Sequence, residues 1–152
     1  MTAPESSDPR WATYPDTIVE IHASPLVRLD LRRPIAPEVV LRLRRLGLGD
    51  AWAIITAHNP GRILPPKENE RREKALAGAV QALGVPFLPA DGVSPDGGHR
   101  EAGIAIALER GRAVALAGEF GQSAIFWFDG EGFWLVPALV GGAPIGLPVS
   151  EA

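Results

Sequence analysis

Polar side chains that could bind a ligand gather where predicted elements of this sequence begin or end. The set holds one hydroxyl, three amides and one guanidinium: Thr56, Asn59, Asn69, Arg72 and Gln122. Thr56 and Asn59 stand at the carboxyl end of an apolar run, where ligands commonly gather outside a layered sheet. Asn69 and Arg72 lie three residues apart near a predicted helix start, and a helix start with an arginine favours anions. The pattern predicts a polar cleft for a small anionic ligand.

His99 and Glu101 are the candidate catalytic residues. Two positions apart on a strand, their side chains point to the same face, as an acid–base pair requires. We expect Glu101 to border the same cleft as Asn59, Asn69, Arg72 and Gln122. The alternative places His99 in a solvated loop and pairs Glu101 with an arginine.

Other signatures of chemistry are missing from the sequence. It has no cysteine, which excludes a thiolate metal site and a cysteine nucleophile. Ser123 has no Gly-x-Ser-x-Gly context, and the Gly- and Asp-containing segment 91–99 lacks the Lys-Ser/Thr of a phosphate loop. We therefore expect no cofactor and no metal, and the sequence leaves open whether the protein is an enzyme.

The amides and the arginine also have a structural interpretation. Asn59 before a proline and Asn69 near a helix start are ordinary choices for a turn and a cap, and Arg72 can pair with Glu68 or Glu73. A buried structural network of this kind loses stability when one member is removed, whereas a ligand site keeps its stability or gains some.

The chain resembles a small bacterial family known as domain of unknown function 3293. The resemblance covers roughly residues 14–137 and is carried by Ile54-Ile55-Thr56-Ala57-x-Asn59-Pro60, Glu68-Asn69-x-x-Arg72, Glu101 and Phe120-Gly121-Gln122-x-Ala124. It implies one compact domain in which these positions are characteristic, and it brings no activity, cofactor or substrate. His99 departs from the pattern, which has an aromatic residue two places before the glutamate.

Periodicity predicts an α+β single domain, a mixed β-sheet with two or three helices packed mostly on one face. The predicted strands are 17–23, 26–31, 51–57, 85–90, 101–108, 124–128 and 132–137, and the predicted helices are 38–46, 67–83 and 112–120. Residues 91–99 should form a flexible turn, and the aromatic residues of 126–134 should pack in the core. We expect a flexible arm over 1–16, the domain over 17–140, and a Gly/Pro-rich tail over 141–152 in which Ile145 and Leu147 follow a sheet edge.

Composition limits the partners. The 152 residues carry a net charge of −3, which disfavours general nucleic-acid binding, although six arginines stand within 28–45 against Asp30 and Glu38. No apolar run is long enough to span a membrane, and the acidic first 24 residues resemble no signal peptide. We therefore expect a cytoplasmic protein.

Three functions remain. The first is a ligand-binding or regulatory interaction domain, whose partner is a small anionic molecule or a protein. The alternatives are a small enzyme acting on an anionic or nucleotide-like substrate, and a weak nucleic-acid-binding protein. The sequence does not fix the oligomeric state.

Overall fold

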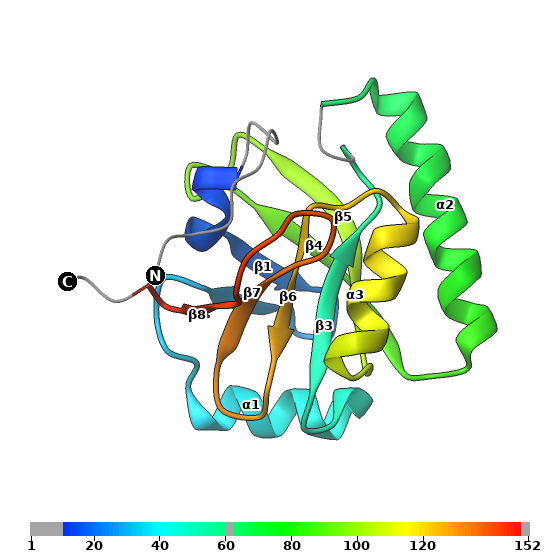
Figure 1. Cartoon of the computed structure of the whole chain (residues 1–152). Coiled ribbons are helices and arrows are strands. Elements are labelled where there is room, and N and C mark those ends of the chain that lie inside the picture. Colours follow the sequence, from blue (N-terminus) through cyan, green and yellow to red (C-terminus); the bar gives the residue numbers. More distant parts are fainter. Residues whose placement is uncertain (1–10, 60–62, 150–152) are drawn as a thin grey trace.

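The fold is a strongly curled antiparallel sheet with two helices on its outer face (Figure 1). In this computed structural model, the structure describes residues 11–59 and 63–149. The sheet has eight strands in the order β2-β1-β4-β5-β3-β6-β7-β8.

The centre of the sheet is a β-α-β-β-α-β unit. Its elements are β3 (Trp52–Thr56), α2 (Pro66–Leu83), β4 (Phe87–Val93), β5 (Arg100–Ile106), α3 (Arg110–Glu119) and β6 (Ala124–Phe128). Each helix connects two strands that have one other strand between them: β5 separates β3 from β4, and β3 separates β5 from β6. This is the split arrangement of ferredoxin-like folds.

Further elements extend this unit at both sides. On one side, β1 (Ile18–Ile21) pairs with β4 and β2 (Val27–Asp30) pairs with β1, while on the other side β7 (Phe133–Pro137) and β8 (Ile145–Leu147) follow β6. A short helix, η1 (Trp11–Asp16), precedes β1, and α1 (Pro37–Leu43) runs into η2 (Arg44–Leu48) below the sheet in Figure 1. The curl brings Leu31 and Leu147 from opposite ends of the sheet to one small hollow.

The α+β fold class is confirmed, with one correction to the sheet. Every pairing between the described strands is antiparallel, so the sheet is not mixed. Each of the two helices joins a pair of parallel strands, and an antiparallel strand lies between the two strands of each pair. Local sequence patterns predict the helices and strands, but they do not predict which strand lies between two strands that a helix joins.

Several element boundaries differ from those predicted. Strand β4 runs on to Val93, through part of the segment expected to be a flexible turn, because it pairs with β5 as far as Arg100. Residues 94–99 form the tight connection instead. Of the expected arm, residues 1–10 lie outside the described residues and 11–16 form η1. Within the expected tail, Ile145 and Leu147 belong to β8, which pairs with β7.

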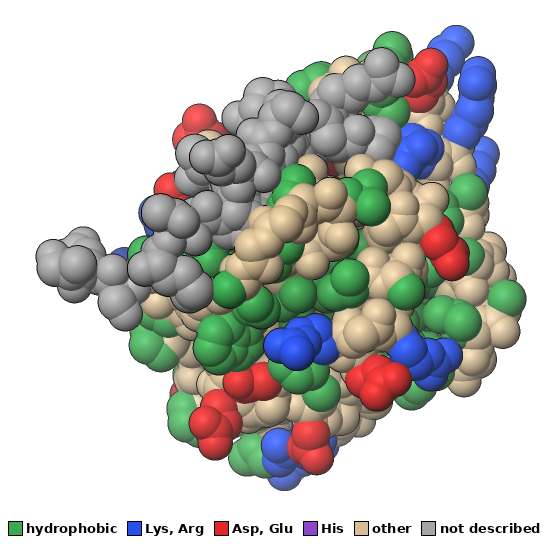
Figure 2. Space-filling view, viewed as in Figure 1, with side chains coloured by type: hydrophobic (Ala, Val, Ile, Leu, Met, Phe, Trp, Pro, Cys, Tyr) green, Lys and Arg blue, Asp and Glu red, His purple; other side chains and the backbone are tan. Residues whose placement is uncertain are grey.

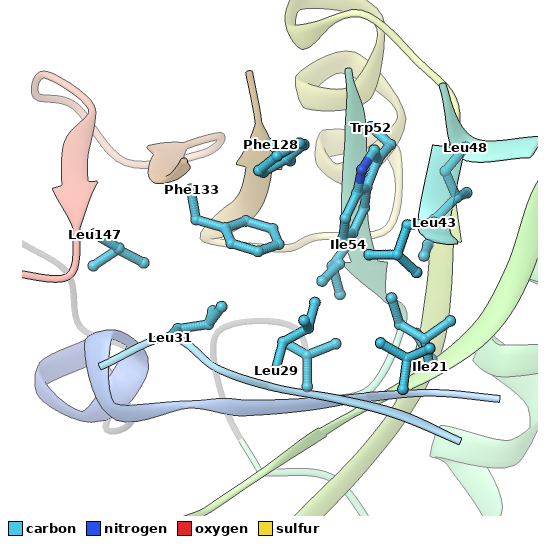
Figure 3. Close-up of a cluster of buried hydrophobic side chains, with 14 of the residues drawn as sticks. Ile21, Leu29, Leu31, Leu43, Leu48, Trp52, Ile54, Phe128, Phe133 and Leu147 are labelled. Atoms are coloured by element: carbon cyan, nitrogen blue, oxygen red, sulfur yellow. The ribbon is translucent and has the colours of Figure 1, made fainter. Parts of the chain in front are cut away.

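Two apolar clusters cover the two faces of the sheet. On the outer face, alternate strand residues such as Ile55 and Ile104 pack under Leu76 and Val80 of α2 and under Leu116 of α3. The inner face closes around a second cluster, in which β2, α1 and η2 contribute leucines that face Trp52 and Ile54 (Figure 3). Of the aromatic residues expected in the core, Phe128 and Phe133 are part of it, and their rings and that of Trp52 lie 5.2–5.4 Å apart between centroids. Trp134 was also expected there, but it is exposed.

The arginines of residues 28–45 are mostly held by acceptors of the chain itself. Arg32 pairs with Asp30 at 2.8 Å, Arg44 pairs with Asp50 at 2.7 Å, and Arg42 donates to the carbonyl of Pro25. Figure 2 shows blue and red side chains interspersed around α1 at the lower end of the molecule. Acidic side chains and a backbone carbonyl therefore offset most of the charge of these arginines.

Asp30 gives a prediction about acid stability. The hydrogen bond from the side chain of Arg32 is the main cause that lowers the pKa of Asp30 from 3.8 to about 2. A lowered pKa contributes stability that is present above the unfolded value of 3.8 and lost as the pH falls through 2. We expect Asp30→Asn to cost about 1 kcal/mol or less of unfolding free energy at pH 7, and progressively less as the pH falls toward 2.

Urea unfolding at several pH values measures this effect, and Asp50→Asn is a matched control. The side chain of Asp50 is 80% exposed, so its pair with Arg44 should contribute less than that of Asp30, whose side chain is 26% exposed. A cost of Asp30→Asn that stays constant from pH 7 to pH 2 would contradict the assignment.

None of the described helices is long and apolar enough to cross a membrane.

Candidate functional site

The polar residues near the carboxyl end of β3 fall on two sides of the sheet. Alternation along β3 sends Ile55 and Ala57 toward the helices and Ile54 toward the inner face. On α2, a stripe spaced by three or four residues faces the sheet, and it contains Asn69, Arg72, Leu76 and Val80. Leu76 and Val80 pack against the sheet and fix the position of the helix. Asn69 and Arg72, on the same side of the helix, therefore lie next to the segment that follows β3.

Asn59 and Asn69 form hydrogen bonds with each other and link the segment after β3 to the start of α2. The backbone N–H of Asn59 donates to Oδ1 of Asn69 at 2.8 Å, and Nδ2 of Asn69 donates to Oδ1 of Asn59 at 2.9 Å. The same oxygen of Asn59 accepts from the backbone N–H of Leu64 at 2.8 Å. Asn59 has a φ of 48°, a left-handed conformation that asparagine tolerates better than most residues. Both amides are buried, and their bonds join Asn59 and Leu64 to the first turn of α2.

Arg72 and Gln122 tie the end of β3 to the end of α3. Nε of Arg72 donates to the carbonyl of Ala57 at 2.6 Å, and its Nη2 donates to the carbonyl of Phe120. Nε2 of Gln122 donates to the carbonyl of His58 at 3.0 Å and lies 3.4 Å from the carbonyl of Phe120. These acceptors are backbone oxygens at places where the chain leaves regular structure, and such groups need partners when they are buried. We call Asn59, Asn69, Arg72 and Gln122 the junction network.

A cavity of about 120 Å³ opens on the inner face of the sheet, close to the junction network. Its apolar wall includes Ile54, Phe126 and Leu135, and Tyr14 of η1 contributes to the lining, with its ring edge-on to Phe126 at 6.3 Å. The space exists because neighbouring strands carry small residues here: Ala90, Gly92, Gly103 and Ala124.

Gly103 marks the tightest point of this wall. A Cβ added there would meet the carbonyl oxygen of Ile55 at 2.4 Å, so the strands β3 and β5 could not approach as they do. Gly92 pairs directly with Glu101 and leaves room for its side chain. Small residues thus both permit the curl of the sheet and create the space beneath it.

His99 and Glu101 stand together in the lining of the cavity. Nε2 of His99 lies 3.0 Å from Oε2 of Glu101, which is buried, while about half of the His99 side chain is exposed. The connection 94–99 positions the histidine: the backbone N–H of His99 donates to Oγ of Ser94 at 3.0 Å, and that of Ser94 donates to the carbonyl of His99 at 2.9 Å. The geometry is that of a pair able to share or transfer a proton.

The structure therefore does not gather all the predicted residues into one cleft. Thr56, His99, Glu101 and Gln122 line the cavity, and Gln122 also belongs to the junction network. Asn59, Asn69 and Arg72 hold the chain on the other side and are not part of the lining. Among residues 11–59 and 63–149, no three His, Asp or Glu side chains are grouped so that they could hold a metal ion.

Sequence reasoning missed several residues of the lining: Thr13, Asp16, Thr17, Ser94 and Pro95. All come from η1, its junction with β1, or the connection between β4 and β5. The sequence predicts a flexible arm at Thr13 and Asp16, the start of a strand at Thr17, and a flexible turn at Ser94 and Pro95. A usable signal was the recurrence of alanine and glycine in three predicted strands, because small residues on adjacent strands leave space.

Comparison with known proteins finds a similarity that covers most of the central β-α-β-β-α-β unit. A family model described as "Protein of unknown function (DUF3293)" matches residues 55–125. This segment belongs to that family. The DUF3293 segment runs from β3 into β6 and contains the whole junction network, together with His99 and Glu101. No curated protein and no solved structure matches the chain.

Proposed function

We propose that this protein is a small-molecule-binding domain whose ligand occupies the cavity on the inner face of the sheet. The observation that carries the proposal is the composition of that cavity: an apolar wall with the His99–Glu101 pair beside it. Ligand sites in proteins typically combine an apolar enclosure with a few placed polar groups.

The junction network is a weaker candidate for the ligand site. The guanidinium of Arg72 and the amide nitrogen of Gln122 already bind backbone carbonyls, and the two asparagines bind each other. A ligand there would have to replace these bonds and leave buried carbonyls without donors, at about 1–3 kcal/mol for each group.

The size of the cavity limits the ligand. An apolar cavity of about 150 Å³ accommodates benzene, so a space of about 120 Å³ suits one compact ring or a branched chain. Either the whole ligand is this small or one such group of a larger molecule enters the cavity.

A second function is favoured by one observation. The 3.0 Å contact between His99 and Glu101 places a proton donor and acceptor beside a cavity, as a small enzyme using general acid–base catalysis requires. Binding is common to both functions, so a binding experiment comes first.

Thermal unfolding in the presence of a library of small ring compounds tests the proposal. A compound present at about 100 times its dissociation constant stabilises the native state by about 2.7 kcal/mol, which raises the melting temperature by several degrees. We expect Ala124→Leu to abolish that rise, because the larger side chain fills the cavity.

Ala115→Leu is the matched control, since Ala115 is exposed on α3 and does not line the cavity. The proposal is wrong if stabilising compounds raise the melting temperature of both variants as much as that of the unmodified protein, or if no compound of this size binds.

A further inference from the structure

We propose that the ligand of the cavity is a compact protonated amine. This inference rests on the proposed binding function and adds the chemical class of the ligand. It comes from the hydrogen-bond directions and the charges of the lining residues.

Three polar side chains of the lining, those of Thr56, Ser94 and Gln122, donate their hydrogens to other groups of the protein. Oγ of Thr56 donates its hydrogen to the carbonyl of Ala102 at 2.8 Å, and Oγ of Ser94 donates to Oδ1 of Asp96 at 2.7 Å. The amide nitrogen of Gln122 is directed at two carbonyls. What these three side chains retain for a ligand is acceptor capacity.

The charged side chains of the lining also favour a ligand that donates hydrogen bonds and carries a positive charge. The lining contains the carboxylates of Asp16 and Glu101, and among its described members there is no lysine or arginine. A carboxylate at the edge of an apolar cavity attracts a cation more strongly than it would in water, because the local dielectric constant is lower.

The arginines nearest in sequence act elsewhere. Arg100 adjoins Glu101, but strand alternation sends it to the other face, where it pairs with Asp91 and Glu20 at 2.7 Å each. Arg72, on which the expectation of an anionic ligand depended, belongs to the junction network and is not in the lining. An anionic ligand would therefore meet two carboxylates and no lysine or arginine among the described lining residues.

A protonated amine suits this arrangement. Its ammonium group supplies three donors to a lining rich in acceptors, and its apolar body packs against Ile54 and Phe126. His99 is the one described lining residue that can also carry a positive charge, and it contacts Glu101 from the partly exposed side.

Three probes of similar size and different charge test the inference: benzylamine, benzyl alcohol and benzoate. We expect calorimetry at pH 7.5 to show benzylamine binding about tenfold or more tightly than benzyl alcohol, and benzoate binding most weakly. Glu101→Gln, which keeps the size of the side chain, should weaken benzylamine about tenfold and change benzyl alcohol less than about twofold. Glu109→Gln, at an exposed position outside the lining, is the control and should change neither.

Asp16→Asn provides a second variant at an exposed position, so the charge can be tested even if Glu101→Gln does not fold. The inference that the ligand is an amine is overturned by any of three results: equal binding of the three probes, tighter binding of benzoate, or a benzylamine affinity that neither variant lowers. In each case the cavity remains a binding site. Failure of all three probes, together with failure of the ring library, would overturn both proposals.

Discussion

Replacing Ile55 with alanine is expected to lower the free energy of unfolding by about 2–5 kcal/mol. Ile55 is 1% exposed, and its strand β3 lies between β5 and β6 at the centre of the β-α-β-β-α-β unit. Its side chain packs in the cluster beneath α2 and α3. Truncation would remove apolar contacts and leave a void that a rigid sheet cannot collapse to fill. Chemical denaturation with urea measures the loss directly.

Ile63→Ala makes the matched control, because Ile63 is 59% exposed and the same atoms are removed. It should change the unfolding free energy by no more than about 0.5 kcal/mol. Ile54→Ala, on the inner face beside the cavity, should destabilise in the same direction as Ile55→Ala. An Ile55→Ala variant as stable as Ile63→Ala would contradict the central place of β3.

The central strand and its helix are the parts of the fold that local sequence predicts best. Residues 51–57 form an apolar run bounded by turn residues, and β3 follows it closely. Helix α2 begins at Pro66, where a proline fits the first turn, and is capped by Gly84 with a φ of 67°. These signals depend on neighbours within a few residues, so a single sequence contains them.

The pairing of the strands could not be predicted in the same way. That β5 enters between β3 and β4 depends on packing between residues about fifty positions apart, such as Ile54 opposite Ala105. The continuation of β4 to Val93 likewise depends on its partner, because Asp91 and Gly92 by themselves favour a turn. Contacts with distant strands override these local preferences.

The candidate site shows the same division. Residue types identified the polar positions, and all of them lie near the carboxyl end of β3 or along the cavity. Their partners, however, are mostly backbone carbonyls such as those of Ala57, His58 and Phe120, and no side-chain pattern reveals a backbone acceptor. The cavity could not be predicted for a similar reason, because it forms only when small residues of separate strands lie side by side.

Replacing Arg72 with alanine should separate the structural interpretation of the junction network from the ligand-binding one. The Arg72 guanidinium joins Ala57, at the end of β3, to Phe120, at the end of α3. Its loss leaves the carbonyl of Ala57 without this donor and removes one of the two side chains that donate to Phe120. We expect a loss of about 2–3 kcal/mol in unfolding free energy, within the usual range for a buried acceptor that loses its partner.

Arg71→Ala is the adjacent control, because Arg71 is exposed on α2 and should contribute no more than about 0.5 kcal/mol. Arg72→Lys should fall between the two, since a single ammonium group cannot reproduce the forked geometry that reaches two carbonyls. If Arg72→Ala instead unfolds at the same urea concentration as the unmodified protein, or at a higher one, the guanidinium does not hold these chain ends together. A stability that is kept or raised on removal is the behaviour of a functional group held under strain, and the anion site first suggested by the sequence would then lie at Arg72.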